Sequence, residues 1–151
     1  MKSTAIALLF LGGSLFACDN DKDDDIKPDD VPAAVKETLS STFPDAQHVE
    51  WEKKGEDFEA DFDVATVEHD ALFNASGSLL MHKFDVAETE LPEQVKTAIS
   101  QNYADYRIDD ADELQKDGTT FYQVELEKDK QEQKLVFAAD GQEQTGVQYW
   151  D

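Results

Sequence analysis

The sequence predicts an α+β protein made of two tandem α-ββββ repeats, with antiparallel sheets and one helix per repeat packed on one face. Three observations predict this: residues 31–84 match residues 91–147, each copy opens with apolar residues at helical spacing, and apolar and acidic residues then alternate. The 151 residues suffice for one domain or two very small ones. With 40% hydrophobic and 10% aromatic residues, the chain has the composition of a folded protein.

Residues 1–17 have the pattern of a secretory signal peptide. Lys2 precedes an apolar run from Ala5 to Phe16, which is too short to span a membrane. The only cysteine, Cys18, stands where this run ends, directly after Ala17. Its placement resembles a bacterial lipobox, which implies cleavage before Cys18 and a diacylglycerol on its thiol. We therefore expect a lipoprotein that reaches the membrane through the lipid on Cys18.

Residues 18–30 contain the lipidated cysteine and an acidic tether without apolar periodicity. Like charges at this density repel one another, so we expect an extended segment. An acidic run directly after the cysteine also resembles the surface-export signal of some Gram-negative lipoproteins. This favours an outer-membrane lipoprotein exposed at the cell surface, with a periplasm-facing anchor as the alternative.

A calcium loop is an alternative interpretation of the tether. Asp19, Asp21 and Asp23 occupy positions one, three and five of an EF-hand-type loop. Position six is Asp24 in place of glycine, and position twelve is Asp30 in place of glutamate. The tether therefore matches the loop only at its start.

Each repeat is expected to begin with a helix of about three turns. A proline stands near the start of each, where its fixed φ suits the first helical turn. The apolar stripes, spaced by four, are Val31, Val35, Leu39 and Phe43 in the first copy and Leu91, Val95, Ile99 and Tyr103 in the second. We expect these stripes to pack in the core.

After each helix the period changes to two, which predicts strands with one buried and one wet face. Glycine-containing turns separate them. The expected strands are 46–53, 57–66, 68–74 and 79–85 in the first copy and 107–116, 120–128, 132–138 and 142–149 in the second. The repeats would then span residues 31–86 and 87–151, and we expect them to share a core or to pair edge to edge.

The motifs of these repeats resemble the PepSY-like, β-lactamase-inhibitor-like family of secreted bacterial proteins. The resemblance lies in the helix motif that starts at Val31 and again at Leu91, in Phe43-Pro44, in Trp51, and in Phe73 to Gly77. It implies an antiparallel sheet with helices on one face, no known catalysis, and a role in binding or inhibiting other proteins. The second copy departs from the motif, since it has no aromatic residue in place of Trp51 and no proline in place of Pro44.

The net charge of −22, with no basic patch, argues against a nucleic-acid partner. We expect Trp51 in the core. The wet strand faces and the end of the chain offer a candidate interface for an unknown, basic protein or peptide partner, with plain solvation of the charges as the alternative. Its residues are Glu59, Asp61, Asp63, Glu125, Glu127 and Trp150.

We find no sequence motif for catalysis, for a cofactor or for a complete metal site. The three histidines have no zinc-type spacing. His69 and His82 could face each other across the 74–77 hairpin, where we expect a solvated cross-strand pair, with a weak two-histidine metal site as the alternative. We therefore expect a non-catalytic binding module. A calcium- or zinc-binding envelope protein is the alternative, and a hydrolase is less favoured.

Overall fold

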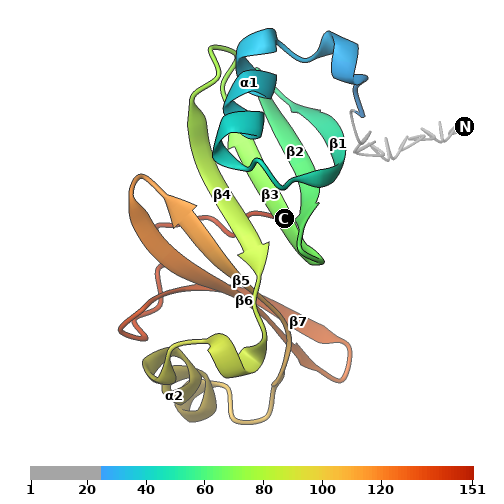
Figure 1. The fold of residues 1–151 in the computed structure, drawn as a ribbon. Coiled ribbons are helices and arrows are strands. Elements are labelled where there is room, and N and C mark those ends of the chain that lie inside the picture. The colour runs from blue at the N-terminus through green and yellow to red at the C-terminus, as the bar shows by residue number, and fades with distance from the viewer. Residues whose placement is uncertain (1–24) are drawn as a thin grey trace, which may run out of the picture.

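The computed structural model describes residues 25–151 and confirms the α+β class (Figure 1). The predictions for the signal peptide, for Cys18 and for most of the tether lie outside these residues. The described end of the tether is not the expected extended segment, because Ile26 packs against the apolar core of the first repeat, its backbone N–H donates to the Trp51 carbonyl at 2.9 Å, and Pro28–Asp30 form a 3₁₀ helix. The elements, including two short 3₁₀ helices η1 and η2, are η1 Pro28–Asp30, α1 Ala33–Thr42, β1 Gln47–Lys54, β2 Asp57–Val64, β3 Val67–Phe73, β4 Leu79–Asp85, η2 Glu88–Glu90, α2 Glu93–Asn102, β5 Arg107–Lys116, β6 Thr119–Lys128 and β7 Gln131–Ala138. None of the helices in this range is long and apolar enough to cross a membrane.

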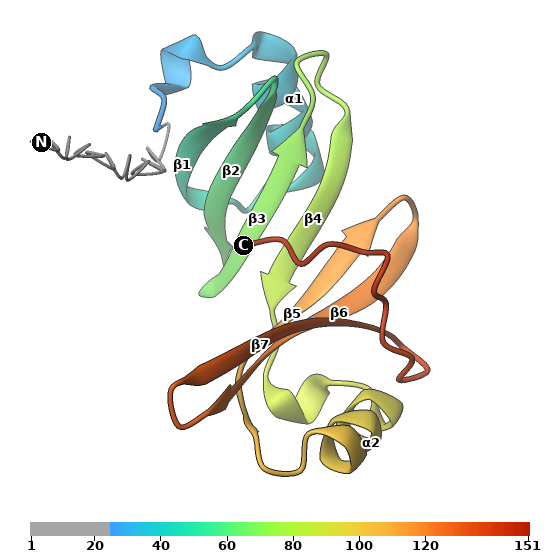
Figure 2. The same ribbon diagram turned by 180° about the vertical axis from the view of Figure 1, so that it is seen from behind.

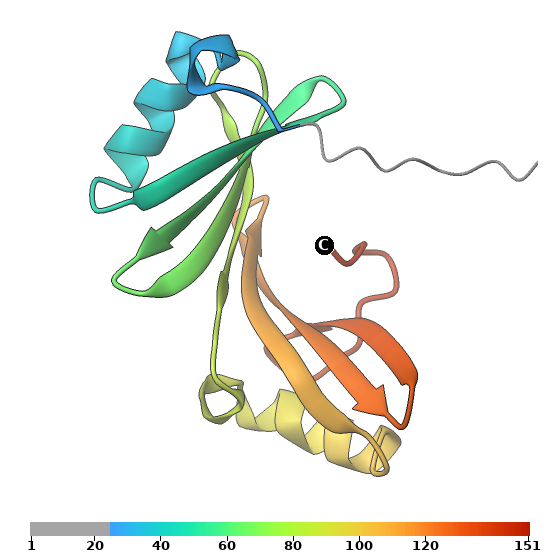
Figure 3. The ribbon, with the colours of Figure 1, turned by 90° about the vertical axis from the view of Figure 1, so that its right-hand side faces the viewer.

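The seven strands form one antiparallel sheet in the order of the chain. The repeats are joined edge to edge, because β4 pairs with β5 and places Phe84 opposite Glu113. Side chains that pair across strands share a face, so both helices cover the same side of the sheet. Figure 3 shows the helices on the outer side of the bent sheet and the end of the chain on the inner side.

Each repeat has its own apolar core between its helix and its strands. The buried residues of the first core are Val31, Val35, Leu39, Trp51, Phe58, Ala60, Phe62, Ala71 and Phe73. Those of the second are Leu91, Val95, Ile99, Ala111, Val124, Leu126 and Phe137. The predicted helical stripes are therefore core residues except at their ends, where Phe43 and Tyr103 are half-buried, and the expected burial of Trp51 is confirmed.

The second repeat differs from the prediction, because residues 142–149 form no strand. This segment pairs with β7 only through an isolated bridge between Glu143 and Phe137. It is built mainly of glutamine, glutamate, threonine and glycine, so it has no apolar row to bury as β4 has. It leaves the sheet edge and crosses the inner side, as Figure 2 shows.

A glycine in each repeat lets a turn approach the start of the helix. Gly77 has φ +88°, and a Cβ there would lie 2.7 Å from the carbonyl oxygen of Ala34. Gly141 has φ +84°, and its Cβ would lie 2.5 Å from the carbonyl oxygen of Gln94. Both contacts are too short for any side chain. The first turn also binds α1 directly, because the Thr38 hydroxyl donates to the Gly77 carbonyl at 2.7 Å.

We predict that Gly77→Ala destabilises the protein more than Gly55→Ala does. Gly55 also has positive φ, of 64°, but its Cβ would meet nothing within 4 Å. Both substitutions carry left-handed strain of about 1–2 kcal/mol, and overpacking adds about 1–3 kcal/mol at Gly77 alone. Chemical denaturation measures both variants. Equal losses at the two positions would contradict the close approach of this turn to α1.

Candidate functional site

The inner face is the side of the sheet opposite both helices, and carboxylates dominate it. Its acidic residues include Glu50, Glu52, Glu59, Asp61, Asp63, Glu68, Asp70, Asp85, Asp110, Asp112, Glu125, Glu127 and Glu132. Lysines on this face are far fewer, with Lys54, Lys83 and Lys134 nearest to these acids.

Like charges lie directly opposite each other on this face. Asp61 is flanked by Glu50 on β1 and Asp70 on β3. Asp63 lies opposite Glu68 in the same way. Such pairs are unfavourable in a sheet. Partial desolvation at the crowded sheet surface, followed by the charges of Asp70 and Glu50, raises the pKa of Asp61 above its ordinary value.

The predicted interface residues lie on this face, but they differ in exposure. Asp61 is exposed, while Asp63, Glu125 and Glu127 are half-buried. Glu59 is the exception to the expected wet face, because it is only 7% exposed. The predicted strand register is nevertheless right, since the neighbouring Phe58 and Ala60 face the core. Glu59 is buried because the end of the chain covers it.

The side chain of Trp150 covers Glu59 on the inner face and forms a hydrogen bond with it. Its indole Nε1–H donates to Glu59 Oε2 at 2.9 Å, and Lys83 Nζ lies 5.6 Å from the centre of its ring. Lys54 Nζ approaches the other Glu59 oxygen to 3.5 Å. Desolvation raises the pKa of Glu59, which the hydrogen bond from Trp150 and the charge of Lys54 partly offset.

Gln123 holds the backbone of the same tryptophan. Its Oε1 accepts from the Trp150 backbone N–H at 2.8 Å, and its Nε2 donates to the Trp150 carbonyl at 2.9 Å. Gln123 is fully buried, and its Nε2 also lies 3.4 Å from Asp112 Oδ2. One side-chain amide therefore satisfies both backbone groups of Trp150, as a neighbouring strand would.

Asp112 is the most deeply buried carboxyl of the inner face, at 3% exposure. It lies opposite Asp85 on β4. Burial raises its pKa to about 6, while the charge of Lys83 and the hydrogen bond from Gln123 oppose this rise. The neighbouring aromatic, Tyr149, has its pKa raised by burial and then by the charge of Asp112.

His69 and His82 face each other across the hairpin, but they do not form the expected solvated pair, because His82 is only 8% exposed and His69 is half-buried. His69 Nδ1 and His82 Nε2 lie 2.9 Å apart, and the rings stack at 5.2 Å between centroids. They pack on the helix side against Phe43, Phe62 and Phe84. Burial lowers the pKa of His82 to about 4, so the ring is neutral at neutral pH. No group of three metal-binding side chains occurs within residues 25–151.

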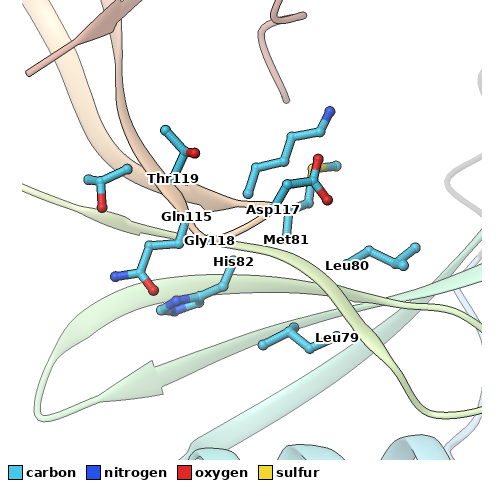
Figure 4. Close-up of a pocket in the computed structure, with 10 residues that line it drawn as sticks. Leu79, Leu80, Met81, His82, Gln115, Asp117, Gly118 and Thr119 are labelled. Carbon is cyan, nitrogen blue, oxygen red and sulfur yellow. The ribbon is translucent and has the colours of Figure 1, made fainter.

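A surface depression of about 400 Å³ lies where β4 meets the turn between β5 and β6 (Figure 4). Leu79, Leu80 and Met81 line one side, with Gln115 and Thr119 across from them. Leu79 and Leu80 are exposed. The two leucines therefore offer exposed apolar contacts beside the polar side chains of Gln115 and Thr119.

Sequence reasoning missed Gln123, Asp112 and Lys83 as parts of one site. The sequence did mark Gln123 as different from its neighbours, because it is the uncharged residue among the inner-face positions of its strand, which continue with Glu125 and Glu127. No local pattern connects it with Trp150, which lies 27 residues further along the chain.

We predict that Asp112→Asn stabilises the protein at pH 8 by about 1–3 kcal/mol. Because the folded state raises the Asp112 pKa from 3.8 to about 6, its favourable protonated form is lost as the pH rises through 6. The gain should therefore shrink as the pH falls and vanish near pH 4. Thermal unfolding from pH 4 to 8 measures it. Asp110→Asn, at an exposed position of the same strand, is the control and should shift stability by less than about 0.5 kcal/mol. A pH-independent gain for Asp112→Asn would contradict this assignment.

This chain is similar to three solved structures from Bacteroides species. A BLIP-like protein from Bacteroides fragilis NCTC 9343 is 26% identical, with a TM-score of 0.66 over 75% of this chain and 83% of that one. A DUF2874 family protein from Bacteroides uniformis ATCC 8492 is 20% identical, with a TM-score of 0.70 over 74% and 85%. A protein from Bacteroides eggerthii DSM 20697, described as "putative periplasmic", is 18% identical, with a TM-score of 0.71 over 75% and 85%. The last two likenesses show the fold alone.

Sequence comparison identifies the family. No match was found among curated proteins. The model of the family described as "Putative beta-lactamase-inhibitor-like, PepSY-like" matches residues 18–80 and again residues 63–144. The two matches confirm the tandem repeat and together span most of the sequence. The chain therefore belongs to the PepSY-like, β-lactamase-inhibitor-like family.

Proposed function

We propose that this protein is a non-catalytic binding module whose inner face receives a basic surface of an envelope or extracellular protein. The family supports a binding role in general. The narrower idea, that binding inhibits the partner, rests on the description of the family and on the likeness to a BLIP-like protein.

The observation that carries the proposal is the set of like-charged pairs across β1, β2 and β3. Glu50, Asp61 and Asp70 form one row of carboxylates. Among residues 25–151, Asp70 is the one member of this row with an ion-pair partner, Lys83, at 3.4 Å. A cationic partner would relieve the repulsion within this row. Neither helix covers this face, so a partner protein can contact it while both apolar cores stay folded.

The proposal includes an address at the cell envelope. Processing at Cys18 would leave the lipid on the first residue of the mature chain and residues 19–30 as the link to the repeats, with Ile26 in this link already packed against the first core. The repeats, assigned to residues 31–86 and 87–151, would then stand away from the membrane. The likeness to a protein described as "putative periplasmic" supports an envelope location, and the acidic tether favours the outer surface.

We predict that a partner captured from envelope extract is lost when charges on the inner face are reversed. The bait is the chain from Asp19 onward, compared with its Asp61→Lys/Glu68→Lys variant. The control is Glu37→Lys/Glu88→Lys, which makes the same charge change at exposed positions on the helix side. Capture should fall with the inner-face variant and with rising salt, but not with the control. Equal loss with both variants would mean that net charge alone drives capture.

The same bait separates the alternatives. Calorimetric titration with zinc, beside the His69→Ala variant, tests the metal-binding alternative. Tight, stoichiometric zinc binding that His69→Ala abolishes, together with no charge-dependent capture, would replace the binding module with a metal-binding function.

We predict that Cys18 carries the lipid anchor. Mass spectrometry of the membrane fraction should find an acylated Cys18 as the first residue. Cys18→Ser removes the thiol and should leave the precursor unprocessed. Protease treatment of intact cells then tests surface exposure. A Cys18→Ser protein that is still cleaved normally and stays bound to the membrane would contradict the anchor.

A further inference from the structure

The centre of the inner face has the features of a peptide-binding site, and the chain's own end occupies it. Gln123 holds the backbone N–H and C=O of Trp150, while Glu59 accepts the indole N–H. The backbone contact fits any extended residue. The carboxylate contact requires a donor on the side chain, which favours tryptophan over phenylalanine.

The site is assembled from both repeats. Glu59 lies on β2 in the first repeat, and Gln123 lies on β6 in the second. Lys83 on β4 approaches the tryptophan ring from between them. Tyr149 extends the contact, because Lys134 on β7 lies 5.2 Å from the centre of its ring and pairs with Asp151. The occupied site therefore extends across most of the width of the sheet.

The segment is held by side chains and not by a strand ladder. Within the described chain, no backbone–backbone hydrogen bond joins residues 145–151 to a strand, and the last one that does is Gln144 N–H to the Val136 carbonyl at 2.7 Å. Gly146 and Gln148 are exposed. An extended segment held in this way can leave without breaking the sheet.

The groups on this part of the inner face are mainly polar, with two buried apolar side chains among them. Leu114 and Val136 lie opposite Lys83 and Gln123 and are 0% and 4% exposed. Departure of the segment returns water to Gln123, Glu59 and Asp112 and uncovers at most this small apolar area. Burial raises the pKa of both carboxyls, which means that each is more favourably ionised in the open state. The closed and open states are therefore closer in free energy than the buried area alone implies.

We propose that the inner face carries a built-in peptide-binding site, that residues 149–151 occupy it in the free protein, and that an extended, tryptophan-bearing segment of a partner protein replaces them. The inference rests on the proposed function, because it assigns the partner's point of entry to the same face. It adds the chemistry that is recognised at the centre of that face: one extended residue with an indole.

The test uses the full chain from Asp19 onward and a peptide of residues 146–151 blocked at both ends, and it needs no natural partner. Trp150→Ala weakens the resident segment and should bind the peptide. The unaltered chain should bind it at least about tenfold more weakly, because its own segment competes at a high effective concentration. Peptide with alanine in place of tryptophan should bind neither chain, and adding Gln123→Ala to Trp150→Ala should abolish binding. Fluorescence anisotropy of labelled peptide measures each case.

Nuclear magnetic resonance provides a second measurement that does not depend on the variant's folding. In the unaltered chain, saturating peptide should move the indole N–H resonance of Trp150 toward that of a free tryptophan. The resonance of Trp51 should stay in place, since Trp51 is buried in the first core on the other side of the sheet. Movement of both resonances would indicate unfolding and contradict the proposal.

The outcomes separate this inference from the proposed function. Two results together would overturn the inference: a folded Trp150→Ala chain that does not bind the peptide, and a Trp150 resonance that does not move in the unaltered chain. Charge-dependent capture of a partner would still support the proposed function. Exchange of chain ends between two copies, seen as a concentration-dependent dimer of the unaltered chain, would make a second copy the occupant and would also overturn it. Peptide binding without any captured protein would count against the proposed function alone.

Discussion

The structure depends on one constraint: each repeat contains one α-helix of ten residues. Such a helix covers one face of its strands and leaves the other face without an apolar partner. Pairing of β4 with β5 then joins the two sheets with both helices on the same side. The opposite face, continuous across both repeats, is left mainly to polar residues, with Leu114 and Val136 buried among them, and to the end of the chain. The position of every site described above follows from this arrangement.

The inner face has two regions with different physical character. Over β1 to β3 it is an open field of carboxylates, which acts on encounter rate and on the charge of the partner and weakens with salt. At the centre, Gln123, Glu59 and Lys83 form directed contacts around Trp150. Directed hydrogen bonds in a buried site give specificity, because an unpaired polar group there is costly. The two regions together combine attraction from a distance with selection at contact.

The repeats keep their shape while exchanging side-chain volume within the core. Trp51 lies opposite the small Ala60 in the first repeat, whereas Ala111 lies opposite Val124 in the second. Cores tolerate such exchanges when the total volume is roughly kept. Backbone approaches are less tolerant, and both repeats retain a glycine where a turn meets the helix, at Gly77 and Gly141. The duplication is therefore more visible in its turns and helical stripes than in its core residues.

The sequence by itself determined the order of the two α-helices and of strands β1 to β7, the duplication, the family and the face on which the residues of these strands lie, because these follow from local periodicity and motifs. It also predicted that His69 and His82 would meet, since one hairpin places them together. Only the tertiary structure decided that residues 142–149 leave the sheet and that Trp150 buries Glu59. The contact between Trp150 and Glu59 joins residues 91 positions apart. Its free energy is the balance between the hydrogen bond that forms and the desolvation of the carboxylate where the two repeats meet. Periodicity records which way a side chain points, but it does not record which distant segment will cover it.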